Sequence, residues 1–158
     1  LQTIHEETLK IINRGHSLEN FENCIKELKK RNIFTVVHII NGLPFETKEM
    51  MIETVKYLNN LKIDAIKIHM LHILKNTPLA DYYYQTNFHV LTKEEYIDIV
   101  CDQLSELDPK IVIERITGDP TKEDLIAPEW LLKKFCVLND IDKEMKKRDI
   151  YQGDSLAH

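Results

Sequence analysis

The chain has 158 residues, of which 43% are hydrophobic and 30% are charged, and its formal net charge is -5. This balance is typical of one globular domain with a core, and it excludes an intrinsically disordered chain. The acidic excess disfavours a general nucleic-acid surface, which requires clustered Lys and Arg. No apolar stretch nears the roughly 18 residues of a membrane span and no signal-peptide pattern is present, so the chain is expected to be cytoplasmic with no membrane partner.

The three cysteines, Cys24, Cys101 and Cys136, are too far apart in sequence for a disulfide framework or a metal-binding motif. They are interpreted as buried free thiols. The basic cluster near the end of the chain, from Lys143 to Arg148, is interpreted as the solvated face of a helix rather than as a binding site.

Two helices are predicted at the start of the chain. The first covers residues 6–13 and breaks at Arg14 and Gly15. The second is capped by Ser17 and ends in a run of cations near Arg31, which suits the negative end of a helix.

An apolar run then covers residues 33–41 and stops at Gly-Leu-Pro. Such a run predicts a buried parallel strand that leaves the sheet through a loop. Alternation puts His38 on one face with Val36 and Ile40. Because ligands collect at the carboxyl ends of parallel strands, His38 and Asn41 are placed at the functional edge.

A second strand is predicted over residues 64–73, after a helix capped by Thr47. The spacing of about thirty residues between the two strands is typical of a βαβ unit, so the sheet is expected to be parallel. On this strand Lys67 and His69 lie on the face opposite Ile66 and Ile68.

The remaining elements follow in the same pattern. A short helix is expected over residues 79–84, and a capping box at Thr92 and Glu95 opens the next helix. A third strand covers residues 110–117, the last helix begins near Pro128, and residues 151–158 form a tail. The fold class is therefore α/β: a partial (β/α) barrel with parallel strands, covering helices and a C-terminal helical extension.

The histidines near the strand ends are the first candidate site. His69 and His72 are three residues apart on an extended strand, which puts them on opposite faces. Lining of a pocket is the favoured interpretation. A metal site made by His38 and His69 with Glu114 or Asp119 remains the alternative.

Gln2 and Arg14 form the second candidate site, since both are expected beside the edge where His38 ends its strand. A guanidinium can bind a carboxylate or phosphate in bidentate fashion, and a glutamine amide can both donate and accept. Taken alone, an arginine is more often a surface cation.

The order of several short motifs resembles the second half of a radical S-adenosylmethionine (radical SAM) core, in the branch of oxygen-independent coproporphyrinogen oxidase and the elongator catalytic subunit. More narrowly, the chain resembles the YhcC-type Fe-S oxidoreductase family. The motifs are Leu-Gln-Thr at 1–3, Asn-Arg-Gly-His at 13–16, Asn-Gly-Leu-Pro at 41–44, Glu-Thr at 46–47, Asn-Thr-Pro-Leu at 76–79, Arg-Ile-Thr-Gly-Asp-Pro at 115–120, Ala-Pro-Glu-Trp at 127–130 and Tyr-Gln-Gly at 151–153.

The resemblance implies that Gln2, Arg14 and His38 bind S-adenosylmethionine. A residue in the position of His38 is often acidic in the coproporphyrinogen-oxidase branch, so its contact with the cofactor is not carried over directly. Backbone at residues 71–73 would border the adenine. The substrate side would be lined by Lys67, His69, Glu114, Arg115 and Asp119.

The family holds a [4Fe-4S] cluster on Cys-x3-Cys-x2-Cys, which this sequence lacks. The resemblance thus implies a single domain, residues 1–158, from the C-terminal part of a longer radical SAM enzyme, with the cluster ligands upstream of residue 1. The fragment alone is expected to be inactive, and to self-associate through an exposed strand edge.

The leading hypothesis is that the parent enzyme cleaves S-adenosylmethionine reductively to a 5'-deoxyadenosyl radical, which abstracts hydrogen from an unknown small-molecule or macromolecular substrate. An electron donor such as flavodoxin or ferredoxin is implied. Two alternatives remain: a non-enzymatic α/β domain that binds a ligand or partner, and an RNA-modifying radical SAM enzyme, which the acidic balance disfavours.

Overall fold

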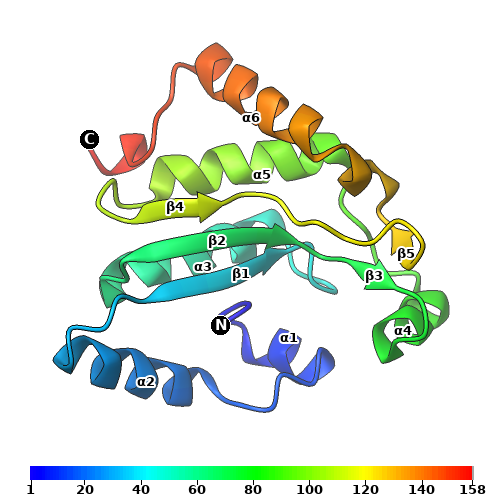
Figure 1. The fold of residues 1–158 in the computed structure, drawn as a ribbon, viewed down its shortest axis with the longest axis horizontal. Coiled ribbons are helices and arrows are strands. Elements are labelled where there is room, and N and C mark those ends of the chain that lie inside the picture. The colour runs from blue at the N-terminus through cyan, green and yellow to red at the C-terminus, as the bar shows by residue number, and fades with distance from the viewer. Residues whose placement is uncertain (158) are drawn as a thin grey trace.

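The computed structural model describes residues 1–157, with position 134 described in its backbone only. At its centre lies a parallel sheet with the strand order β1-β2-β4. These strands are β1 (Val36–Asn41), β2 (Ala65–Met70) and β4 (Val112–Arg115). The crossovers run through α3 (Lys48–Leu61) and α5 (Lys93–Glu106), as Figure 1 shows. The predicted α/β class and parallel sheet are confirmed.

The N-terminal helices lie beside the β1 edge of this sheet (Figure 1). They are α1 (Glu6–Ile11) and α2 (Leu18–Lys30), and the side chain of Ser17 accepts a hydrogen bond from the backbone of Asn20 at the start of α2. The starts of β1 and β2 are joined by Asp64, whose carboxylate accepts from both the backbone and the hydroxyl of Thr35, each at 2.8 Å. These two bonds tie the residue just before β1 to the residue just before β2.

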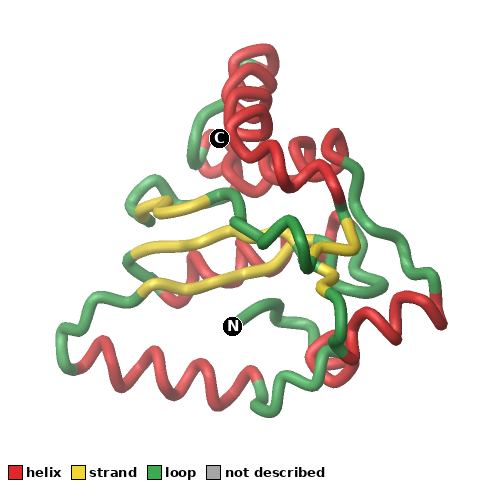
Figure 2. The backbone as a smooth tube through the Cα atoms, turned by 45° about the vertical axis from the view of Figure 1, so that its right-hand side comes forward, coloured by secondary structure: helices red, strands yellow, loops and turns green. Residues whose placement is uncertain are grey.

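One face of the sheet forms the core. Val37, Ile39, Ile66 and Ile68 are all buried, and they pack with buried side chains of α2, α3, α5 and α6. Alternation along the strands sends the other set of side chains to the opposite face. There, His38 is exposed and the neighbouring strand residues are only partly buried. In Figures 1 and 2, α3 lies behind the strands, and no helix of the described chain crosses the front of β1 and β2.

Three predictions about elements need correction. The strand predicted over residues 64–73 ends at Met70, and β3 (Ile73–Leu74) belongs to a second sheet, where it pairs antiparallel with β5 (Leu125–Ala127). The strand predicted over residues 110–117 is shortened to β4. Residues 151–157 are not a free tail, because the backbone N–H of Gly153 donates to the carbonyl of Leu104 in α5 and a turn of 3-10 helix follows at Asp154–Leu156. The last residue of the predicted tail, 158, lies outside the described residues.

The other helices lie near their predicted places. The short helix α4 covers Pro78–Thr86, and the capping box of Thr92 and Glu95 opens α5. After Pro128 the chain forms a 3-10 helix (Glu129–Lys133) before α6 (Lys134–Arg148), so the last regular helix begins later than expected.

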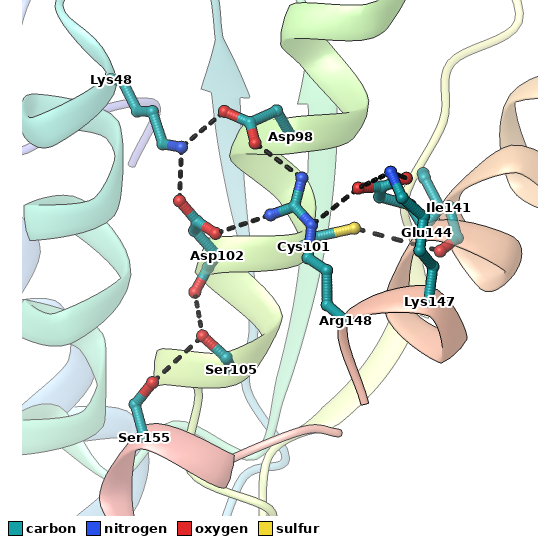
Figure 3. A network of polar contacts seen from close by, with 10 residues as sticks. All are labelled: Lys48, Asp98, Cys101, Asp102, Ser105, Ile141, Glu144, Lys147, Arg148 and Ser155. Carbon is teal, nitrogen blue, oxygen red and sulfur yellow. Dashed lines mark hydrogen bonds and ion pairs between the residues drawn. The ribbon is translucent and has the colours of Figure 1, made fainter. Parts of the chain in front are cut away.

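A network of ion pairs fastens α6 to α5 and α3, as Figure 3 shows. The Arg148 guanidinium donates to Asp98 at 2.6 Å, to Asp102 at 3.0 Å and to Glu144 at 2.9 Å. Lys48 of α3 pairs with the same two aspartates. These contacts hold the pKa of Asp98 below its ordinary value, with the bond from Lys48 as the largest cause.

The lysines of the basic cluster predicted near the end of the chain pair with carboxylates of their own helix. Lys143 pairs with Asp140, Lys146 with Asp142, and Lys147 with Glu144. Interpretation of this cluster as a helix face is therefore consistent with its contacts.

Candidate functional site

A cavity of about 480 Å³ lies where the start of the chain meets the carboxyl halves of β1 and β2. Its lining includes Gln2, Arg14 and His38, the three residues that the sequence analysis assigned to one site, so the structure brings them together. The rest of the lining comes from Leu1, Val36, Ile40, His69, Met70, Leu71 and His72. Of residues 71–73, whose backbone was expected to border the adenine, residues 71 and 72 line this cavity.

Gln2 reaches the cavity because the first residues run along β1. The backbone N–H of Ile40 donates to the carbonyl of Gln2 at 3.0 Å, which is the bond that a neighbouring strand would make. The side-chain oxygen of Gln2 is buried and accepts no hydrogen bond from any residue that the structure describes. A buried polar atom without a partner is costly, and a ligand that donates to it would relieve the cost.

The turn after α1 directs Arg14 to the same place. Asn13 takes a left-handed conformation with φ +51°, Gly15 another with φ +80°, and the backbone N–H of Arg14 donates to the carbonyl of Leu9 at 2.9 Å. The Nε of Arg14 is buried, and within residues 1–157 nothing accepts its hydrogen. A guanidinium held this way is suited to a carboxylate or a phosphate.

Two histidines stack on the face of the sheet opposite the core, here called the open face. The rings of His38 and His69 lie 5.4 Å apart with an interplanar angle of 16°. Burial lowers the pKa of His69 to about 4, with a further contribution from His38. Burial, and after it the charge of Lys67, also lowers the pKa of His38. Both rings are therefore neutral near pH 7 and can each offer one donor and one acceptor.

His72 also lines the cavity, which corrects the prediction that His69 and His72 face opposite sides. Regular alternation fails because β2 ends at Met70, and the chain turns before His72. The Nε2 atoms of both rings are buried and have no partner in the described part of the chain. Burial lowers the pKa of His72, and the neighbouring charge of Asp119 opposes that shift.

Gly118 makes room for the His72 ring. A Cβ at this position would lie 2.4 Å from the Nε2 of His72, closer than real Cβ contacts come. A glycine is therefore needed at this position because the backbone approaches a residue of the cavity so closely.

Of the five predicted substrate-side residues, His69 lines the cavity, and the other four are not part of its lining. Lys67 and Glu114 form an ion pair at 3.1 Å between β2 and β4. His38, Lys67 and Arg115 are register partners on three adjacent strands, so they form one row across the sheet. Asp119 lines a different cavity, of about 320 Å³, together with residues 131–133. Contact of a substrate with Lys67, Glu114, Arg115 and Asp119 stays a prediction.

Asn41, placed at the functional edge by the sequence, points into the core. Its amide exchanges two hydrogen bonds with the buried amide of Gln103, at 2.7 and 2.9 Å. The Nε2 of Gln103 also donates to the carbonyl of Met51 at 2.9 Å. Gln103 was not predicted from the sequence, although a glutamine on the largely apolar face of α5 was an available signal.

No metal centre is found among the residues that the structure describes: they include no group of three or more His, Cys, Asp or Glu able to hold an ion. The alternative of a metal on His38 and His69 is thus not supported within residues 1–157. The three cysteines lie on three helices, Cys101 buried but Cys24 and Cys136 exposed, which corrects the prediction of three buried thiols. Such separated thiols do not fit an iron–sulfur cluster.

The arrangement is suited to a polar ligand that carries a carboxylate. It combines one guanidinium, one amide and three neutral imidazoles around a partly apolar cavity. Four of these side chains keep a buried polar atom without a partner within the described chain, namely Gln2, Arg14, His69 and His72. S-adenosylmethionine, with a methionine carboxylate, a ribose and an adenine, fits this set of donors and acceptors.

Two family models match the chain. The one described as Radical_SAM C-terminal domain matches residues 63–147, and the one described as Radical SAM superfamily matches residues 1–58. No helix in the described part of the chain is long and apolar enough to cross a membrane.

Two curated proteins are similar over nearly the whole chain. YtqA of Bacillus subtilis (strain 168) is 42% identical over 153 residues, a match that covers 97% of this chain and 48% of YtqA. Protein YhcC of Escherichia coli (strain K12) is 26% identical over 157 residues, covering 99% of this chain and 50% of YhcC. The chain therefore spans about half the length of the curated relatives it matches.

The solved structures similar in fold include the archaeal Methanocaldococcus infernus Elp3 with an N-terminal deletion, which superimposes with a TM-score of 0.83 at 22% identity. The match covers 96% of this chain and 35% of that chain. At this identity the likeness shows the fold alone.

Proposed function

Because the chain belongs to the radical SAM superfamily, we propose that the protein containing it cleaves S-adenosylmethionine reductively and uses the 5'-deoxyadenosyl radical to abstract hydrogen from a substrate. The observation that supports this most directly is the pair of buried, unpartnered polar atoms on Gln2 and Arg14 in one cavity of the described chain. Bound to a [4Fe-4S] cluster, S-adenosylmethionine supplies the radical chemistry.

In this proposal each residue of the chain has a binding role. Arg14 donates through its guanidinium to the methionine carboxylate, the charge-assisted bond for which a planar fork is best suited. Gln2 accepts from a hydroxyl or amino group of the nucleoside through Oε1. His38, held neutral, hydrogen-bonds a ribose hydroxyl in place of the acidic residue common in the coproporphyrinogen-oxidase branch.

The cluster would be held elsewhere in the protein, because the cysteines of the described residues do not fit it. We infer that its ligands precede residue 1, that an electron donor such as flavodoxin or ferredoxin reduces it, and that this chain alone is inactive. Since the chain spans about half of its relatives, these proposals concern the whole protein.

Arg14→Ala in the full-length protein tests the cofactor assignment. Removal of a charged hydrogen-bond partner is expected to weaken S-adenosylmethionine binding by roughly tenfold or more, measured by isothermal titration calorimetry. Arg31→Ala, at an exposed arginine after α2, is the matched control. Arg14→Lys keeps the charge but not the fork and should fall between the two. Wild-type affinity in Arg14→Ala would refute the assignment.

The rival proposal is a binding domain without catalysis that uses the same cavity for a small anion or a partner protein. Anaerobic reconstitution of the full-length protein with iron and sulfide, followed by an assay for 5'-deoxyadenosine, separates the two. Formation of 5'-deoxyadenosine supports the enzyme, and its absence from a fully reconstituted cluster protein supports the binding domain.

An RNA substrate remains the other alternative. The chain itself offers little support, because its net charge is -5 and Lys143, Lys146 and Lys147 are paired with carboxylates of their own helix. Binding of transfer RNA to the full-length protein, lost on raising the salt concentration, would favour it.

We also infer that the chain produced alone associates with itself through the outer edge of β1, where the backbone of Ile40 bonds to Gln2. Light scattering that gives a clean monomer at high protein concentration would contradict this.

A further inference from the structure

An irregularity between β2 and β4 determines which charges reach the open face. Ile66 pairs with Ile113, but Lys67 pairs with Arg115, so Glu114 is an extra residue on β4. Strict alternation would send Glu114 and Arg115 to opposite faces. The bulge instead leaves both exposed, with Glu114 bonded to Lys67 and Arg115 level with it. Bulges of this kind commonly re-aim a side chain beside a functional site.

The charges in this row do not cancel. Glu114 is neutralised by Lys67 at 3.1 Å. Arg115 makes no hydrogen bond or ion pair with the residues that the structure describes, and its positive charge lies close enough to lower the pKa of both His38 and His69. An unpaired guanidinium therefore stands on the open face of a chain whose overall charge is negative.

Between Arg115 and the cavity lie the ion pair of Lys67 with Glu114, whose charges offset each other, and the neutral ring of His69. His69 has a buried Nε2 without a partner in the described chain, and burial keeps its ring uncharged. Two strand spacings, roughly 10 Å, separate the backbones of His38 and Arg115. A molecule of moderate size that is anchored at Arg115 would thus extend across His69 toward the cavity.

We propose that Arg115 is the anchor for an anionic group, a carboxylate or a phosphate, of the substrate. This rests on the proposed function, in which Arg14 is taken by the cofactor carboxylate and is not available to the substrate. The neutral imidazole of His69 hydrogen-bonds an uncharged group of the same molecule. The ion pair of Lys67 with Glu114 holds the bulge that presents Arg115.

The test uses inorganic phosphate and succinate as probes, titrated by calorimetry into the full-length protein at constant ionic strength. Arg14→Gln is the reference protein, because it removes the guanidinium that lines the cavity. It is expected to bind at least one of the two probes, and the addition of Arg115→Gln should weaken that binding roughly tenfold or more. Arg31→Gln, added to the same reference, is expected to change nothing.

The outcomes identify the anionic group that Arg115 binds and separate this proposal from the assignment of Arg14 to the cofactor. Preference for phosphate identifies a phosphorylated substrate, and preference for succinate a carboxylate. Arg115→Lys, which keeps the charge, should retain part of the affinity and shows that the site still folds. The inference is overturned if neither probe binds the reference protein, or if Arg115→Gln binds as tightly as the reference. Failure of the cofactor assignment is seen separately, as unchanged S-adenosylmethionine affinity in Arg14→Gln.

Discussion

The buried amide pair of Asn41 and Gln103 offers a sharp test of how the core supports the site. Gln103 is fully buried and Asn41 is 1% exposed, and each amide satisfies the other. The backbone carbonyl of Asn41 also accepts from the N–H of Leu71, a residue of the cavity, at 2.9 Å. Gln103→Met keeps the volume similar but leaves both polar groups of the Asn41 side chain buried without a partner.

The expected loss follows from the cost of unsatisfied buried groups. Each orphaned donor or acceptor costs about 1–3 kcal/mol, so the two orphaned groups of Asn41 in Gln103→Met should lower the free energy of unfolding by roughly 2–6 kcal/mol. Gln103→Met also removes the hydrogen bond to the Met51 carbonyl, which adds little to this loss of stability. That carbonyl lies within α3, where backbone donors are also available to it. Urea unfolding followed by far-ultraviolet circular dichroism measures the change.

A double mutant tests whether the two buried amides depend on each other. Asn41→Leu combined with Gln103→Met replaces both amides by apolar groups, so its loss should be smaller than the sum of the two single losses. The control Gln85→Met lies on the exposed surface of α4 and should stay within about 0.5 kcal/mol of the wild type. Additive losses in the double mutant would show that the two amides do not depend on each other.

Three further predictions concern the cavity and its scaffold. Gly118→Ala should displace the His72 ring, since the added Cβ would lie 2.4 Å from Nε2; an unchanged His72 resonance by NMR would contradict the packing. Because burial lowers the pKa of His69 from 6.5 to about 4, the unfolded chain takes up the proton first. Stability from this residue is therefore lost as pH falls from 6.5 toward 4, and His69→Asn should flatten the curve of unfolding free energy in that window. Arg148→Ala should cost about 1 kcal/mol at low salt and less at high salt, because it breaks an ion-pair network that salt screens; thermal unfolding with no loss at low salt would refute this.

Local patterns were sufficient for most of the fold. The apolar run that ends at Gly-Leu-Pro, and its spacing from the next strand, predicted a parallel sheet, and alternation placed His38 and Lys67 on the open face. The caps at Ser17, Thr47 and Thr92 predicted three helix starts. The convergence of Gln2 and Arg14 on one cavity was expected from the resemblance to a family rather than from spacing alone.

The sequence by itself therefore determined the regular elements and the faces of their side chains, because these depend on short-range periodicity. Only the tertiary structure decided where the periodicity fails. The end of β2 at Met70 turns His72 into the cavity, the bulge at Glu114 exposes Arg115, and Asn41 turns inward to meet Gln103. Each of these depends on contacts between segments 40 or more residues apart, such as the 62 residues that separate Asn41 from Gln103. Hydrogen-bond satisfaction across such distances is a property of the packed chain, and no local pattern encodes it.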